Sequence, residues 1–166
     1  MTNVSRNFRA AKIAALLVAA LAMGACAKNP AGQDVGALAN ASAATPGSQQ
    51  DFVVNVGDRV FFNSDSSALT PQSVATLDKQ AQWLRSYSQY TFVIEGHADE
   101  RGTREYNIAL GARRAQAVHD YLASRGVQAH RMHTISYGKE RPVAVCDDIS
   151  CWSQNRRAVT VLNASS

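Results

Sequence analysis

The sequence has few aromatic residues, few cysteines and no hydrophobic run that spans a membrane comfortably. Aromatic residues make up 7% of the 166 residues, and the three cysteines are too few for a disulfide-rich scaffold. The apolar run from Ile13 to Ala25 has 13 residues, about 20 Å as a helix against a bilayer core of about 30 Å. Because 46% of the residues are hydrophobic, the chain is neither wholly disordered nor a membrane bundle, and its length suits one domain.

The first 25 residues have the pattern of a signal peptide. Residues 1–12 carry three basic residues and no acidic one, and the apolar run follows. The run ends in Leu-Ala-Met-Gly-Ala before Cys26, which resembles the lipobox of bacterial lipoproteins, although Met23 stands where that motif prefers Leu. The resemblance implies cleavage before Cys26, which then carries an S-diacylglycerol and an N-palmitoyl group. Ala27, in place of Asp, resembles the outer-membrane sorting pattern; an ordinary signal peptide cut near Ala25 is the alternative.

Most of the positive charge belongs to this leader. The whole chain has 17 basic and 13 acidic residues, a net charge of +4. Without Arg6, Arg9 and Lys12, 14 basic residues remain against the same 13 acidic ones, a net charge of +1. A protein that binds nucleic-acid phosphates needs a concentrated basic surface, so we expect no nucleic-acid partner.

Residues 26–50 are predicted to be a lipid-anchored flexible linker. Residues 27–50 contain no aromatic residue and only two charged ones, Lys28 and Asp34. Such a segment buries too little apolar surface to offset the entropy of ordering it, and as a coil it spans roughly 25–30 Å. The folded domain is therefore predicted to occupy residues 51–166.

The pattern after residue 51 predicts an α/β (α+β) sandwich, in the order β-α-β-α-β-β, with helices on one face of a mixed four-stranded sheet. Strands are predicted at 56–62, 90–95, 132–137 and 158–162. Thr70 and Thr103 can cap two helices, Pro71 suits a first helical position, and Gly126 suits the end of the second helix. The contiguous apolar residues 92–94 predict a strand covered on both faces.

The second predicted helix has a stripe of apolar residues at helical spacing, which predicts its buried face. The stripe consists of Tyr106, Leu110, Ala117, Val118, Tyr121 and Leu122. A loop or short helix near Trp152 is expected to pack before the last strand, together with Cys146 and Cys151.

The densest polar cluster, residues 95–102, follows the second predicted strand. Loops that lead from a strand to a helix are where α/β folds usually place their sites. Asp99 lies in this loop, and Arg113 and Arg114 lie three turns into the next helix. A carboxylate and a guanidinium that converge on one cavity suit a zwitterionic ligand. An internal ion pair between Asp99 and an arginine, or a solvated charged face, is the alternative.

Several spaced motifs closely resemble the OmpA-like peptidoglycan-binding domain family. They are residues 96–107, which read GHADERGTREYN, and residues 110–115, 137–142 and 155–159. The resemblance covers about residues 55–163. It implies non-covalent binding of meso-diaminopimelate, an amino acid of the peptidoglycan stem peptide. It further implies that Asp99 receives the side-chain ammonium and Arg114 the carboxylate.

The resemblance also implies further contacts to this ligand. Asp65 matches a residue in the loop after the first strand, and Arg101 and Leu110 match flanking contacts. Ser64 stands where the family has Phe, which removes an apolar contact and leaves the charged pair.

Together with the lipobox, the resemblance implies an outer-membrane lipoprotein on the periplasmic face that tethers the outer membrane to the cell wall. It also implies TolB and other Tol proteins as partners, with a role in outer-membrane invagination during cell division and in envelope integrity. A cell-wall hydrolase with the same anchor is the alternative, but no nucleophile with a positioned base and no pair of flanking carboxylates is evident. A flagellar-motor protein with this domain would carry a transmembrane helix, which we do not expect here. We expect no enzymatic activity and no cofactor.

The remaining polar and sulfur-containing residues are candidates for a metal site or a disulfide. His97, Asp99 and Glu100 have no further ligand at a recognisable spacing, so no metal site is predicted. With Cys26 assigned to lipid, Cys146 and Cys151 remain as an even pair in an exported chain. A disulfide between them is predicted, and it would close a short loop.

Overall fold

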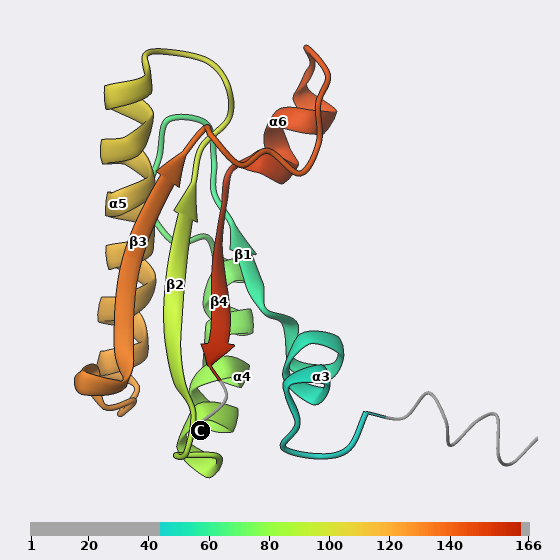
Figure 1. Ribbon diagram of the computed structural model, residues 1–166, viewed down its shortest axis with the longest axis vertical. Helices are drawn as coiled ribbons and strands as arrows, with labels where there is room; N and C mark the ends of the chain where they lie inside the picture. The colour runs from blue at the N-terminus through green and yellow to red at the C-terminus, as the bar shows by residue number, and fades with distance from the viewer. Residues whose placement is uncertain (1–43, 164–166) are drawn as a thin grey trace, which may run out of the picture. The chain divides into compact units, whose positions relative to one another are not determined.

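The computed structural model describes residues 44–163 (Figure 1). The predicted leader, Cys26 and most of the predicted linker lie outside the described residues. None of the described helices is long and apolar enough to cross a membrane. The elements, in chain order, are α3 (Gln49–Asp51), the π-helical turn η1 (Phe52–Gly57), β1 (Arg59–Phe61), α4 (Pro71–Ser86), β2 (Thr91–His97), α5 (Arg104–Ser124), the 3₁₀ turn η2 (Ala129–Arg131), β3 (Met132–Gly138), α6 (Ile149–Asn155) and β4 (Arg157–Asn163).

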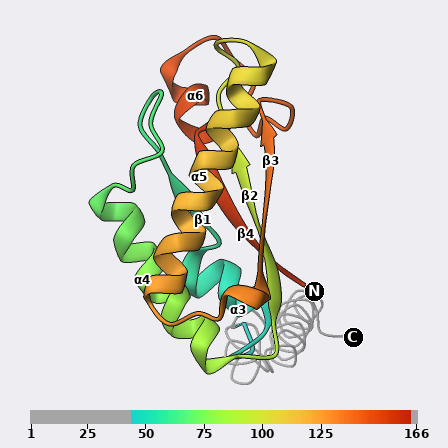
Figure 2. The same cartoon turned by 90° about the vertical axis from the view of Figure 1, so that its left-hand side faces the viewer.

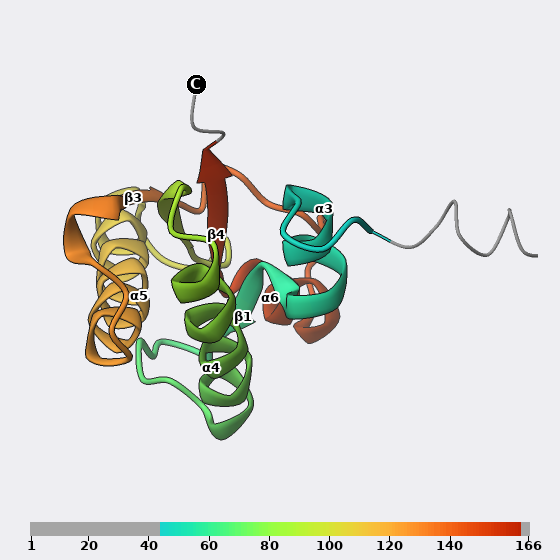
Figure 3. The ribbon, with the colours of Figure 1, turned by 90° about the horizontal axis from the view of Figure 1, so that it is seen from below.

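The four strands form one mixed sheet in the order β1-β4-β2-β3. β4 runs antiparallel to both of its neighbours, β1 and β2, whereas β2 and β3 are parallel. Figures 2 and 3 show α4 and α5 on the same side of this sheet. The predicted fold class, helices on one face of a mixed four-stranded sheet, is confirmed.

The side chains of β2 alternate between the two faces of the sheet. Phe92 and Ile94 are fully buried beneath the helices, but Val93 is only half-buried. Ile135 of β3 and Val161 of β4, 41% and 38% exposed, are among the large apolar residues that solvent reaches. The expectation of a strand covered on both faces was therefore wrong, because the helices cover only one face.

The predicted helix ends are confirmed. The Thr70 hydroxyl accepts a hydrogen bond from the Ser73 N–H at 3.1 Å, and the Thr103 hydroxyl accepts one from the Tyr106 N–H at 3.2 Å. Gly126, just past α5, has φ +87°. Each threonine satisfies one N–H that the first helical turn leaves free.

The predicted buried face of α5 is only half right. Leu110, Val118 and Leu122 are buried, but Tyr106 is 45% exposed. Ala117 and Tyr121 are half-buried, and the buried face instead includes Gly111, Arg114 and Ala115.

Two glycines let α5 lie directly against β2. A Cβ atom added to Gly96 would lie 1.8 Å from the Gly111 carbonyl oxygen, closer than any two such atoms can approach. The Ser136 hydroxyl of β3 also donates to the Ile108 carbonyl of α5 at 2.7 Å. This close contact fixes the start of α5 beside the loop that follows β2.

The first strand is shorter than the predicted span 56–62. Residues 52–57 form a helical turn in which Phe52 is fully buried, with its ring 4.9 Å from that of Trp83. Residues 44–50, part of the predicted linker, also contact the domain. Tyr90 donates to the Gly47 carbonyl at 2.8 Å, and Ser48 caps α3. The domain boundaries themselves stay a prediction.

Candidate functional site

A cleft of about 270 Å³ lies where the loop after β1, the loop after β2 and the start of α5 meet. Five of the six residues predicted to contact a ligand line it. The lining consists of Ser64, Asp65, Asp99, Arg101, Gly102, Tyr106, Asn107 and Leu110. The fold thus brings Ser64 and Asp65 beside residues that lie more than 30 positions further along the chain.

Asp99 is 7% exposed and is bound by two arginines. Arg101 donates from Nε to Oδ1 at 3.1 Å and from Nη2 to Oδ2 at 2.7 Å, and its backbone N–H donates to Oδ1 at 3.2 Å. Arg156 donates from Nη1 to Oδ2 at 3.3 Å. Burial raises the pKa of Asp99, but the hydrogen bonds from Arg101 and Arg156 outweigh it and hold the pKa below its ordinary value. The internal ion pair, the alternative from the sequence, is therefore present.

Arg114 does not line the cleft. Its side chain is completely buried, and its three nitrogen atoms each donate to a backbone carbonyl. The acceptors are Ser66 at 2.9 Å, His97 at 2.7 Å and Asn63 at 3.1 Å. Arg114 therefore connects the loop after β1 to the end of β2.

The charge of Arg114 persists in this environment. Burial lowers its pKa to about 10, and the negative charge of Asp99 opposes that shift. The guanidinium is therefore protonated at neutral pH. A guanidinium has five N–H donors, so three bonds to carbonyls leave two N–H groups without an assigned acceptor.

The loop after β1 is joined to α5 and to the loop after β2 by side chains. Asp65 adopts a left-handed conformation, with φ +53°, and its carboxylate accepts a hydrogen bond from the Tyr106 hydroxyl. This bond raises the pKa of Tyr106. The Ser64 hydroxyl accepts from Nη2 of Arg101 at 2.8 Å. The small Ser64 thus pairs with a cation at the position where the sequence resemblance implies Phe.

Sequence reasoning missed three residues that line the cleft, which are Gly102 and the polar Tyr106 and Asn107. The sequence places Tyr106 in the buried stripe of α5, and it gives Asn107 only as part of the motif at residues 96–107, with no contact assigned to it. The Asn107 amide donates to the Arg101 carbonyl at 2.8 Å and so holds the loop. Tyr106 and Asn107 lie in the first turn of α5, directly after the polar loop. That position was the signal from which a contact to the ligand could have been predicted.

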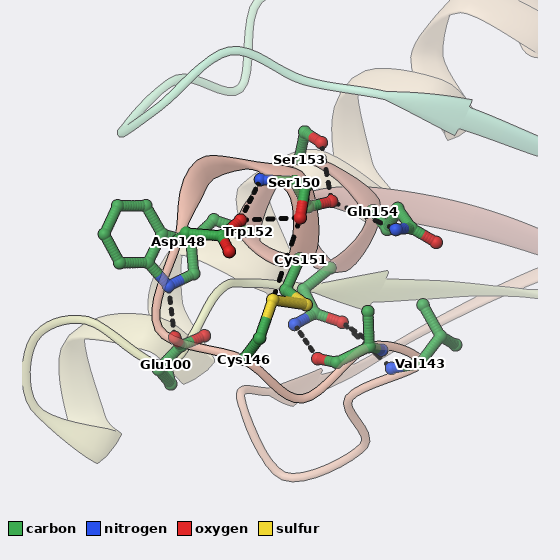
Figure 4. The surroundings of a disulfide bond; sticks show 11 residues. Glu100, Val143, Cys146, Asp148, Ser150, Cys151, Trp152, Ser153 and Gln154 are labelled. Atoms are coloured by element: carbon green, nitrogen blue, oxygen red, sulfur yellow. Dashed lines mark hydrogen bonds between the residues drawn. A yellow bond between two sulfur atoms is a disulfide. The ribbon is translucent and has the colours of Figure 1, made fainter.

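A third element, α6, lies at the same end of the sheet (Figure 1). The Trp152 ring lies under the Arg101 guanidinium, with Cζ 4.2 Å from the ring centroid, and its Nε1 donates to Glu100. A disulfide joins Cys146 to Cys151, the residue before Trp152, with 5.6 Å between their Cα atoms (Figure 4). The sequence predicted this disulfide, whereas for Trp152 it indicated only that the ring packs the last loop.

The loop around Glu100 is held by hydrogen bonds from a lysine side chain. Lys139 donates from Nζ to the Glu100 and Gly102 carbonyls at 3.1 and 2.7 Å. His97 is buried, and neither of its ring nitrogens has a hydrogen-bond partner. Within residues 44–163, no three His, Cys, Asp or Glu side chains are grouped so as to hold a metal ion.

Comparison of the sequence with known proteins gives one consistent match. Residues 61–158 match the family described as "OmpA family". The chain is 62% identical over 167 residues to the peptidoglycan-associated lipoprotein of Rhizobium meliloti, covering 99% of this chain and 93% of that protein. It is 53% identical over 97 residues to the peptidoglycan-associated lipoprotein of Pseudomonas aeruginosa, covering 58% of this chain and 57% of that protein.

Solved structures agree with this match. The crystal structure of the peptidoglycan-associated lipoprotein from Burkholderia pseudomallei has a TM-score of 0.62 at 45% identity, covering 64% of this chain and 90% of that one. The C-terminal domain of Helicobacter pylori MotB has a TM-score of 0.61 at 22% identity, covering 64% and 84%. The second likeness concerns the fold alone.

Proposed function

The chain belongs to the OmpA family, and from that premise we propose that its cleft binds the diaminopimelate-containing stem peptide of peptidoglycan without a covalent bond. Its relatives are peptidoglycan-associated lipoproteins, which makes it a binding protein and not an enzyme. The alternative of a lipid-anchored cell-wall hydrolase is therefore set aside.

One observation carries the proposal. Five residues expected to contact the ligand, from three separate segments, line a single cleft of about 270 Å³. In this proposal Asp99 receives the ammonium of diaminopimelate, and the fixed positive charge of Arg114, which is buried outside the cleft lining, attracts its carboxylate. Arg101, Ser64, Asp65 and Leu110 contact the rest of the stem peptide.

The pairing of Asp99 with an ammonium is physically reasonable. A carboxylate that is nearly buried and ionised at neutral pH is a strong acceptor for a charged donor. Diaminopimelate differs from lysine by an added carboxylate, so a site with a cation near Asp99 distinguishes the two. The positive charge of Arg114, fixed beside the cleft by three carbonyls, supports this selectivity.

We further propose that the chain tethers the outer membrane to the cell wall from the periplasmic side. The lipobox ending at Cys26 would supply the acyl anchor, and the following residues would supply the linker. TolB and other Tol proteins are the proposed partners, with a role in outer-membrane invagination during division. The lipobox and the lipoprotein relatives support the anchor, while the Tol partners follow from family resemblance.

The stem-peptide proposal is tested with purified peptidoglycan sacculi and the mature protein. Asp99→Asn removes the charge while keeping the shape, and we expect sacculus binding to weaken at least about 30-fold, because the ligand ammonium is left unpaired. The matched control is Asp120→Asn on α5, an exposed carboxylate whose partners are Gln116 and His119. Equal binding by the two variants would reject the site. Release of soluble muropeptides by the wild-type protein would favour the hydrolase instead.

A further inference from the structure

Every acceptor position of the Asp99 carboxylate is already filled. Oδ1 accepts from the backbone N–H and Nε of Arg101, and Oδ2 accepts from Nη2 of Arg101 and Nη1 of Arg156. An ionised carboxylate offers about four acceptor positions. A ligand ammonium can therefore reach Asp99 only if one of these donors leaves.

The two arginines differ in how easily they can leave. The side chain of Arg156 is 8% exposed, and its Nε also donates to the Phe62 carbonyl at 3.1 Å. The side chain of Arg101 is 43% exposed. Releasing Arg156 would leave a buried charge without its partner, which is costly, whereas a released Arg101 is solvated at once. Arg101 is the donor that leaves.

Two contacts beyond Asp99 keep Arg101 in place. Its Nη2 donates to the Ser64 hydroxyl at 2.8 Å, and its guanidinium lies 4.2 Å above the Trp152 ring. A cation over an indole ring is the strongest of the cation–aromatic contacts. Trp152 thus stabilises the arrangement in which Arg101 occupies Asp99.

Trp152 is itself held firmly at the edge of the cleft. Its Nε1 donates to Glu100, and the disulfide between Cys146 and Cys151 joins the start of α6 to the preceding loop (Figure 4). Asp148 caps α6 by accepting from the Ser150 N–H at 2.7 Å. The ring therefore stays in place when Arg101 moves.

We propose that Arg101 closes the ligand site by occupying Asp99, and that Trp152 is a positioning residue that stabilises this closed arrangement. The inference rests on the proposed function and adds a competition between Arg101 and the ligand ammonium for one carboxylate. Binding then requires Arg101 to move off both Asp99 and the Trp152 ring. Part of the ligand's binding free energy is spent on that movement, so weakening the Trp152 contact strengthens binding.

The test measures binding of a diaminopimelate-containing tetrapeptide to the full mature chain by titration calorimetry. Trp152→Ala is expected to bind the peptide about two- to fivefold more tightly, the effect of one exposed cation–aromatic contact. Trp152→Tyr keeps an aromatic ring under Arg101 and is expected to stay near the wild-type affinity. Ile149→Ala, an exposed apolar position on the same helix, is the matched control and is expected to leave the affinity unchanged. Affinity of Trp152→Ala equal to or weaker than that of Ile149→Ala overturns the proposal.

A spectroscopic measurement reports on the ring directly, and it also decides the question if Trp152→Ala does not fold. The chain has two tryptophans, so 5-fluorotryptophan labelling gives two ¹⁹F resonances, which the Trp152→Tyr variant assigns. The Trp152 resonance is expected to shift as the tetrapeptide is added, because Arg101 leaves the ring. The resonance of Trp83, a residue of α4 that is buried against Asp51 and Phe52, is expected to stay fixed. Saturating peptide without a shift of the Trp152 resonance overturns the proposal.

The controls separate this inference from the proposed function. If the wild-type chain does not bind the tetrapeptide, or if Asp99→Asn binds it equally well, the proposed function fails. If binding depends on Asp99, but Trp152→Ala leaves the affinity unchanged and the Trp152 resonance does not shift with peptide, only the proposed role of Trp152 and Arg101 fails.

Discussion

Replacing Arg114 by alanine is expected to lower the free energy of unfolding of the domain strongly, and not only to impair binding. The guanidinium is completely buried and donates to three carbonyls. Its removal leaves the His97 carbonyl buried without a partner, at a cost of about 1–3 kcal/mol. The Ser66 and Asn63 carbonyls are partly buried and regain some water, so each costs less. Together with the lost packing, we expect the free energy of unfolding to fall by about 3–5 kcal/mol.

The assay is urea denaturation of the mature chain, without its acyl group, followed by circular dichroism at far-ultraviolet wavelengths. With a slope of about 1.5–2 kcal/mol per M urea, this loss lowers the midpoint by about 2 M. The melting temperature falls by about 10–20 °C. Since domains of this size are stable by about 5–15 kcal/mol, this loss removes about a fifth or more of the free energy of unfolding.

Arg113→Ala is the matched control, because Arg113 is the preceding residue on α5 and is exposed to solvent. We expect it to change the stability by no more than about 0.5 kcal/mol. Arg114→Lys should fall between the two, because one ammonium cannot reproduce the planar set of donors that reaches three carbonyls. If Arg114→Ala and Arg113→Ala unfold at the same urea concentration, the structural role of Arg114 is refuted. Asp99→Asn, and not Arg114→Ala, is therefore the variant that tests binding.

Three further predictions concern the core and the last loop. Burial, followed by the nearby charges of Arg157 and Arg141, lowers the pKa of His97 to about 4; the unfolded chain therefore binds a proton there before the folded one, and stability falls by about 3 kcal/mol as the pH drops from about 6.5 to about 4. Urea midpoints across this range should fall less in His97→Gln, and parallel curves would contradict the prediction. Gly96→Ala places a Cβ atom against the Gly111 carbonyl and should leave little folded protein in a thermal melt, whereas melting like the wild type would contradict the close contact. Reducing the disulfide between Cys146 and Cys151 should lower the stability by at most about 2 kcal/mol, because the closed loop is short; a larger loss in urea titrations with reductant would show that the bond does more than close this loop.

Local patterns in the sequence predicted the local structure well. Thr70 and Thr103 identified the starts of α4 and α5, because a hydroxyl cap acts on N–H groups within three residues of it. Gly126 identified the end of α5 for a similarly local reason. The start of the domain was harder, since the helical turn at 52–57 is stabilised by burial of Phe52 against Trp83, a contact between distant parts of the chain.

The sequence predicted which residues lie at the cleft better than it predicted the hydrogen-bond partners of their side chains. The spaced motifs placed five residues in one cleft, and the structure brings those five together. The stripe rule assigned Tyr106 to the core, but its hydroxyl binds Asp65 in the loop after β1. Helical periodicity identifies a face of α5 and says nothing about which loop lies opposite that face.

The sequence by itself determined the family, the fold class, the helix caps and the residues that gather at the cleft, because these depend on local spacing and on motifs. Only the tertiary structure decided which charges pair. Arg101, Arg114 and Arg156 are chemically alike, yet their surroundings differ. Arg101 is partly exposed and binds Asp99, whereas Arg156 is buried and binds the same carboxylate. Arg114 is buried and donates to three backbone carbonyls. The reason is physical: the partner of an arginine depends on which carbonyls and carboxylates the packed chain leaves within hydrogen-bond distance, and on how much water remains there.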